Sequence, residues 1–163
     1  MLLYVIRHAW AGEAGDPRYP DDSMRPLTPE GRKRFRKVVK QLAKREVAPE
    51  RVATSPLVRC RETADALIEG LANAPSLTVL DSLSPGAQLE DVLSWLHHQS
   101  DIGETALVGH APDVGQMVGS MIGGSGALID FAKGAVACIE FEDRVAPGRG
   151  QLRWFVTAKM LGV

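Results

Sequence analysis

The chain has 163 residues, 45% of them hydrophobic, and a formal net charge of −1 from 19 basic and 20 acidic side chains. This length predicts one domain over residues 1–163, and the balanced charge argues against a dedicated nucleic-acid-binding protein. No apolar stretch is long enough to span a membrane. The N-terminus lacks the features of a signal peptide and the two cysteines form no disulfide framework, so we expect a cytoplasmic protein.

The first elements alternate between strand, loop and helix. The apolar run at 2–6 predicts a buried strand, and Arg7 and His8 follow it directly. Residues 12–24 are rich in Gly, Pro and Asp, which predicts a loop. A Thr-Pro pair then predicts the N-cap and the first position of a helix over about 28–45.

The same alternation continues along the rest of the chain. Residues 51–54 predict a strand, and Ser55 with Pro56 predicts the N-cap and first position of the next helix. The other expected elements are strands at 77–80, 105–108, 135–141 and 152–156 and helices that include 89–96 and 114–121. The last two strands indicate a closing hairpin. Four strand–helix alternations predict an α/β fold, a three-layer α/β/α sandwich with a mainly parallel central sheet.

Cationic and imidazole side chains stand at three junctions between a predicted strand and the helix after it. Arg7 and His8 end the first strand, a Ser-Pro-x-x-Arg segment ending at Arg59 follows the second, and Gly-His ending at His110 follows the fourth. Parallel strands place their carboxyl ends at one edge, where helix amino ends also favour anions. Since arginine suits phosphate geometry, these residues predict a pocket for a phosphoryl group.

The same residues predict a mechanism. Neutral imidazole is a good nucleophile toward phosphorus, so His8 is expected to accept the phosphoryl group. Nearby positive charge would lower the pKa of His8, and a hydrogen bond from its other ring nitrogen to a backbone carbonyl would fix its tautomer. Arg7, Arg59 and His110 would hold the phosphoryl oxygens, so that no metal ion or other cofactor is required.

These segments resemble the motifs of the histidine phosphatase (phosphoglycerate mutase-like) superfamily. Arg7-His8-Ala9 is similar to its Arg-His-Gly signature, and the segments ending at Arg59 and His110 are similar to its second and third motifs. Residues 23–28, with the sequence SMRPLT, resemble the Arg-Pro-Leu-Thr block of the SixA-type phosphohistidine phosphatases. Residues 83–85 are similar to that group as well.

The resemblance implies a phosphoglycerate mutase-like fold and a metal-independent hydrolase that dephosphorylates phosphohistidine. It implies His8 as the nucleophile and Arg7, Arg59 and His110 as the phosphoryl-binding groups, with Arg25 either joining them or contacting the substrate. Short loops predict a shallow, open site that a phosphorylated protein can reach. From the balanced charge and the lack of a long apolar stretch, we expect no nucleic acid or membrane as partner. Two alternatives stay open: a general phosphomonoesterase or mutase of the same superfamily, and a non-catalytic phosphate-binding interaction module.

The general acid is not identified by the sequence. Larger members of the superfamily use a carboxylate from an inserted segment, and no such insertion is evident here. Asp22, Glu90 and Asp91 are equal candidates. A phosphohistidine substrate reduces the need for this group, because protonated imidazole already leaves readily.

Several residues also have purely structural interpretations. Arg59 could pair with an acidic residue of its own helix, and Arg25 could only anchor its loop. The adjacent His97 and His98 point to different helix faces, which argues against a metal site. The basic run at 32–40 predicts a solvated helix face or, less simply, a docking surface for an acidic protein. Residues 123–126 follow a helix, so they predict a loop and not a phosphate cradle.

Overall fold

The computed structural model describes residues 1–99, 103–123 and 129–163. In this part of the chain the strands are β1 (Leu2–Arg7), β2 (Arg51–Thr54), β3 (Ser76–Val79), β4 (Glu104–Gly109), β5 (Val136–Glu140) and β6 (Gln151–Val156). The helices are α1 (Pro29–Ala43), α2 (Val58–Glu69), α3 (Leu89–His97) and α4 (Asp113–Met121), with short 3₁₀ helices η1 (Asp22–Met24) and η2 (Asp81–Leu83).

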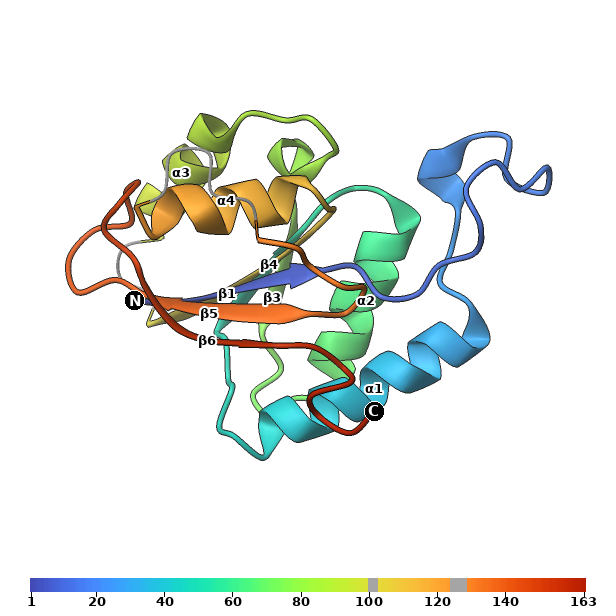
Figure 1. Ribbon diagram of the computed structural model, residues 1–163, viewed down its shortest axis with the longest axis horizontal. Helices are drawn as coiled ribbons and strands as arrows, with labels where there is room; N and C mark the ends of the chain where they lie inside the picture. Colours follow the sequence, from blue (N-terminus) through green and yellow to red (C-terminus); the bar gives the residue numbers. More distant parts are fainter. Residues whose placement is uncertain (100–102, 124–128) are drawn as a thin grey trace.

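The strands form one sheet with the order β3-β2-β4-β1-β5-β6. Strands β1 to β4 run parallel to one another, whereas β5 is antiparallel to both of its neighbours, β1 and β6. Helices α1 and α2 cover one face of the sheet, and α3 and α4 cover the other (Figure 1). The predicted three-layer sandwich, its mainly parallel sheet and its closing hairpin are therefore confirmed.

Strand β1 shows how the sequence builds a core on both faces. Its side chains alternate, so that Tyr4 and Ile6 pack with the core under α1 and α2, while Leu3 and Val5 pack with the core under α3 and α4. All four residues are buried. A strand covered on both faces must be apolar throughout, which explains the continuous hydrophobic run of the sequence.

Helix α1 begins where the sequence predicts. Thr28 Oγ1 accepts a hydrogen bond from the Gly31 amide at 2.9 Å, and Pro29 takes the first helical position. A Cβ atom at Gly31 would collide with the Trp10 carbonyl oxygen, so only glycine lets this helix approach the chain that leaves β1. The helix ends at Ala43, two residues earlier than expected.

Helix α2 does not begin where the sequence predicts. It starts at Val58 with Leu57 as its N-cap, and no side chain caps it. The prediction that Ser55 caps this helix is therefore wrong. Its hydroxyl accepts a hydrogen bond from the amide of Leu57, before the helix, at 3.3 Å and lies 2.9 Å from Nε2 of His110, which follows another strand.

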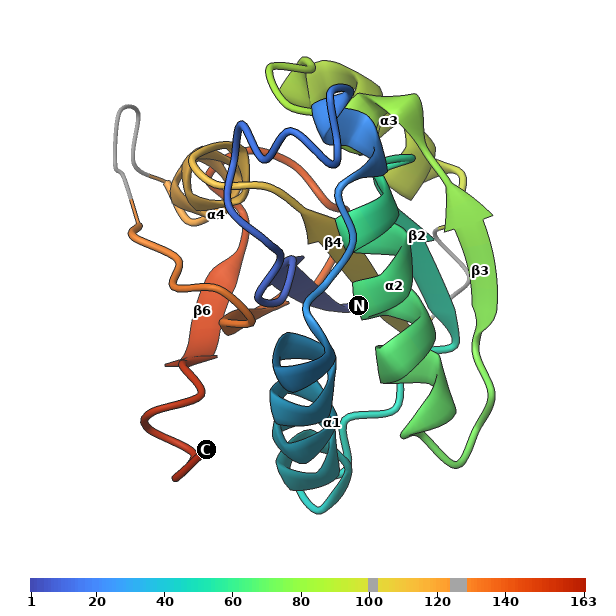
Figure 2. The ribbon, with the colours of Figure 1, turned by 90° about the vertical axis from the view of Figure 1, so that its right-hand side faces the viewer.

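The predicted active edge is the carboxyl edge of the parallel strands. Figure 2 looks onto this edge, which the segment between β1 and α1 crosses, with η1 near the start of α2.

In the part of the chain that the structure describes, no helix has the length and apolar character needed to cross a membrane. Of the loop predicted at 123–126, residues 124–126 lie outside the described residues.

Candidate active site

The structure brings the predicted site residues together at the carboxyl edge of the sheet. Arg7 is the last residue of β1, and His8 and His110 directly follow β1 and β4. The imidazole rings of the two histidines lie 5.3 Å apart between centroids. Arg59, in the first turn of α2, is buried with them, and so is Arg25 from the loop before α1. We call these five residues the phosphoryl socket.

His8 is held as a neutral imidazole of defined tautomer. Its Nδ1 donates a hydrogen bond to the Ala9 carbonyl oxygen at 2.8 Å, which leaves the lone pair on Nε2. Burial, together with the positive charges of Arg59, Arg7 and Arg25, lowers the pKa of His8 to about 4, although the hydrogen bond to Ala9 acts in the opposite direction. Both features match the sequence-based expectation for a nucleophilic imidazole.

His110 lies beside two small polar side chains from the segment that follows β2. Its Nε2 is 2.9 Å from Ser55 Oγ and 3.3 Å from Cys60 Sγ. Burial, together with the charges of His8 and Arg59, lowers the pKa of His110 to about 3. Burial raises the pKa of Cys60 to about 12, so this residue stays a thiol, which donates to the Gly109 carbonyl oxygen at 3.6 Å.

The guanidinium groups of Arg7 and Arg59 are fixed by backbone carbonyls. Arg7 Nη1 donates to the Phe131 oxygen at 2.6 Å, and Arg59 Nη1 donates to the Asp22 backbone oxygen at 2.8 Å. The Nε atom of each is buried without a hydrogen-bond partner among the described residues. Burial lowers the pKa of both side chains, although guanidinium remains charged in proteins.

Asp22 connects the two arginines contributed by different segments. Its Oδ1 accepts from Arg25 Nε at 2.8 Å, and its Oδ2 lies 3.1 Å from Arg59 Nη1. Arg25 Nη1 also donates to the Gly12 carbonyl oxygen at 2.6 Å. The hydrogen bond from Arg25 is the main cause that lowers the pKa of Asp22. Asp22 is thus a carboxylate at neutral pH, unsuited to donate a proton, and Arg25 both anchors its loop and joins the socket.

Helix α2 holds the segment between β1 and α1 in place at three points through one polar face. Besides Arg59, this face carries Glu62, whose carboxylate accepts from the Leu27 amide at 2.7 Å. Thr63 Oγ1 accepts from the Ala9 amide at 3.0 Å and donates to the Arg59 carbonyl oxygen at 2.7 Å. The sequence analysis missed these two roles. The sequence signal for these two roles is the i, i+3, i+4 spacing of polar residues on α2, a helix that follows the carboxyl end of a parallel strand.

Three other structural interpretations can now be compared with the contacts. Arg59 pairs with Asp22 and not with an acid of its own helix. His97 Nε2 donates to the Val145 carbonyl oxygen and His98 Nδ1 donates to that of Ser94. In the basic run of α1, Arg32 and Arg36 both pair with Glu69, as expected for a solvated helix face.

Comparison with known proteins agrees with this geometry. The model of the histidine phosphatase superfamily (branch 1) matches residues 3–84. An uncharacterized protein of Picosynechococcus sp. is 35% identical over 118 residues, 71% of this chain and 70% of its own length. The phosphohistidine phosphatase SixA of Escherichia coli (strain K12) is 28% identical over 156 residues, 94% of this chain and 92% of its own.

The fold has a solved counterpart as well. The structure of the protein histidine phosphatase SixA complexed with tungstate superposes with a TM-score of 0.87 at 26% identity, covering 99% of both chains. The expected phosphoglycerate mutase-like fold is thereby confirmed. From the matched family model, the full-length structural likeness and the assembled Arg-His motif, the chain belongs to the histidine phosphatase superfamily and is a phosphatase of that group.

Proposed function

We propose that this protein is a metal-independent phosphatase that hydrolyses phosphohistidine on a protein, with His8 as the transient carrier of the phosphoryl group. One observation carries the proposal: a buried, neutral His8 keeps Nε2 free as an acceptor, while three arginines act electrostatically on the same ring. The likeness to SixA phosphohistidine phosphatases over nearly the whole chain supports this substrate class.

In the first step, Nε2 of His8 attacks phosphorus as the P–N bond to the substrate histidine breaks. The electron pair of that bond stays on the substrate nitrogen, and a proton already on the other ring nitrogen lets the imidazole leave neutral. His8 keeps its own Nδ1 proton, bonded to the Ala9 oxygen. Arg7, Arg59 and His110 bind the phosphoryl oxygens, and the guanidinium charge performs the role that a metal ion would otherwise have.

In the second step, water attacks phosphorus and the bond to His8 breaks. Inorganic phosphate leaves, one proton of the water passes to a phosphate oxygen, and neutral His8 is restored. The absence of a protonated donor at Asp22 favours a nitrogen leaving group, because the alkoxide released from an ordinary phosphate ester needs a proton.

The test uses a protein phosphorylated on histidine with radiolabelled phosphate. We expect release of inorganic phosphate, retained activity in EDTA, and an acid-labile label on the wild-type chain after rapid quenching. His8→Ala should show neither turnover nor label, whereas His98→Ala, which removes the exposed histidine at the C-cap of α3, should behave as wild type.

Other results would contradict the proposal. A higher kcat/KM for small phosphate esters than for phosphohistidine would indicate a general phosphomonoesterase or mutase. Phosphate binding without any turnover would indicate an interaction module. Labelling that persists in His8→Ala would exclude His8 as the carrier.

A further inference from the structure

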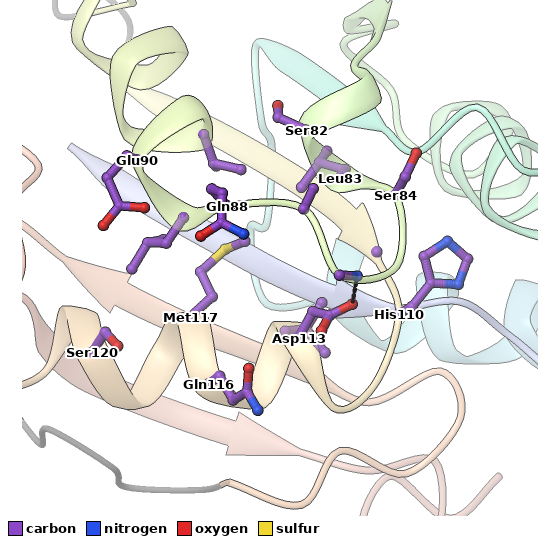
Figure 3. Close-up of a pocket in the computed structure, with 16 residues that line it drawn as sticks. Ser82, Leu83, Ser84, Gln88, Glu90, His110, Asp113, Gln116, Met117 and Ser120 are labelled. Carbon is purple, nitrogen blue, oxygen red and sulfur yellow. Dashed lines mark hydrogen bonds between the residues drawn. The ribbon is translucent and has the colours of Figure 1, made fainter.

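A second cavity adjoins the phosphoryl socket on the other side of His110. It measures about 400 Å³ and lies between α4 and the segment from η2 to the start of α3 (Figure 3). Gly109 and His110 form part of its wall, so this α3–α4 cavity and the socket share the side chain of His110. In Figure 3, His110 lies at one end of the lining residues and Glu90 lies at the other.

The chemistry of the α3–α4 cavity is opposite to that of the socket. Within the described residues, the charged side chains that line it are carboxylates, Glu90 and Asp113, and no lysine or arginine lines it. Its apolar lining includes Leu83, Val92 and Met117, which are buried. The socket therefore favours an anion, while the adjoining cavity favours a group with an apolar stem and a positive end.

Asp113 and Glu90 differ in what they already bind. Asp113 is the first residue of α4, and its Oδ2 accepts a hydrogen bond from the Gly86 amide at 3.1 Å. This bond ties the loop before α3 to α4 at the wall of the cavity (Figure 3). Glu90, in the first turn of α3, is exposed, which leaves its carboxylate available to a ligand.

We propose that the α3–α4 cavity binds the polypeptide that flanks the phosphohistidine, and that Glu90 selects a lysine or arginine in this flanking segment. The inference rests on the proposed function and extends it to the sequence of the substrate. A lysine or arginine places its methylene stem against an apolar floor while its charged end reaches a carboxylate. Acidic metabolites are disfavoured by the same carboxylates.

The experiment compares phosphohistidine peptides that differ at one flanking position. Lysine, glutamine or glutamate is placed at successive positions on either side of the phosphohistidine, and kcat/KM is measured at low salt. At the position that reaches the cavity, we expect the wild-type enzyme to prefer lysine over glutamine by about three- to fivefold, the range of a partly exposed ion pair. This preference should shrink as salt is added.

Variants on the first turn of α3 assign the preference to one side chain. Glu90→Gln should remove the preference for lysine, and Glu90→Lys should turn it into a preference for glutamate. Asp91→Asn is the matched control, because it removes the same charge from the same turn at a residue that does not line the cavity. Its preference should equal that of the wild type.

The outcomes separate this inference from the proposed function. If no phosphohistidine peptide is hydrolysed, the proposed function is wrong. If the peptides are hydrolysed but lysine gives no advantage at any position, the inference about the cavity alone is wrong. The same conclusion follows if Glu90→Gln keeps the preference or if Asp91→Asn loses it equally.

Discussion

Helices α2 and α4 occupy equivalent places in the fold but differ in what they do. Each follows a parallel strand at the carboxyl edge of the sheet. The polar face of α2 binds the segment between β1 and α1 at three points through Arg59, Glu62 and Thr63. In the first turn of α4, Asp113 accepts one such bond from the Gly86 amide. One helix therefore immobilises the groups that we propose bind the phosphoryl group, while the other lines the neighbouring cavity.

Replacing Arg59 on α2 should cause the largest loss of activity. Arg59→Ala should lower kcat/KM for phosphohistidine on the order of 10³-fold, because a phosphoryl-binding charge is lost from a buried site. Arg59→Lys should recover part of this activity, since it restores the charge without the planar fork. Steady-state kinetics on one phosphorylated protein provides the measurement.

Arg61 supplies the matched control for that prediction. It lies two residues further along α2 and is exposed. Arg61→Ala removes the same charge and should stay within about twofold of the wild type. Equal losses at the two positions would mean that bulk charge, and not the geometry of the socket, supports activity.

Lowering the pH should destabilise the folded chain, because His8 and His110 are buried at the carboxyl edge of the sheet as neutral side chains. The pKa of His8 falls from 6.5 to about 4 on folding, so below pH 6.5 the unfolded chain binds more protons than the folded one. The stabilisation is complete above pH 6.5 and is lost as the pH falls toward 4. The loss assigned to His8 is on the order of 2 kcal/mol, measured by urea unfolding between pH 7 and 4.

A variant shows whether His8 causes this acid sensitivity. His8→Asn should flatten the dependence of unfolding free energy on pH in that window, leaving the contribution of His110, whose pKa is lowered to about 3. An unchanged slope in His8→Asn would contradict the assignment. The same depressed pKa predicts that turnover persists below pH 6, because His8 stays unprotonated there.

Replacing Thr63 on α2 should have a smaller effect on activity and should also lower stability. Thr63→Val leaves the buried Ala9 amide without its acceptor, at a cost of about 1–3 kcal/mol in unfolding free energy. Because the Ala9 carbonyl oxygen accepts the hydrogen bond from Nδ1 of His8, a displaced Ala9 should misalign the imidazole. We therefore expect kcat to fall about tenfold and the acid limb of its pH profile to shift. Thr63→Ser should restore both properties.

Thr105 on β4 is the control for Thr63. It is fully buried, but its hydroxyl has no hydrogen-bond partner among the described residues. Thr105→Val should therefore leave stability unchanged or raise it, with kcat preserved. A loss of activity at Thr105 as large as that at Thr63 would show that any buried threonine near the sheet matters equally.

Two Ser/Thr-Pro pairs explain what the sequence can and cannot predict. Thr28-Pro29 and Ser55-Pro56 carry the same local signal for a helix start, and the signal is correct for Thr28 alone. The hydroxyl of Thr28 accepts from an amide inside the helix, three residues away, whereas that of Ser55 accepts from the Leu57 amide before the helix and also contacts the distant His110. Local patterns predict contacts within a few residues, and they fail where a distant segment offers a competing partner.

The same distinction separates the predicted from the unpredicted parts of the site. Arg7, His8, Arg59 and His110 were predictable because their elements alternate regularly and parallel strands end together. The roles of Asp22, Glu62 and Thr63 depend on how the long segment between β1 and α1 returns to α2. The spacing of polar residues on α2 indicates a polar face, but it does not identify the partners of that face.

The carboxylate of Asp22 pairs with both Arg25 and Arg59. Arg25 and Arg59 repel each other, which is one cause that lowers the pKa of Arg59. Because Asp22 binds both, the protein carries a built-in counterion at this point. The two arginines can therefore come together during folding without an anion from the solvent between them. The phosphoryl group of the proposed substrate would then bind to arginines that are already in position.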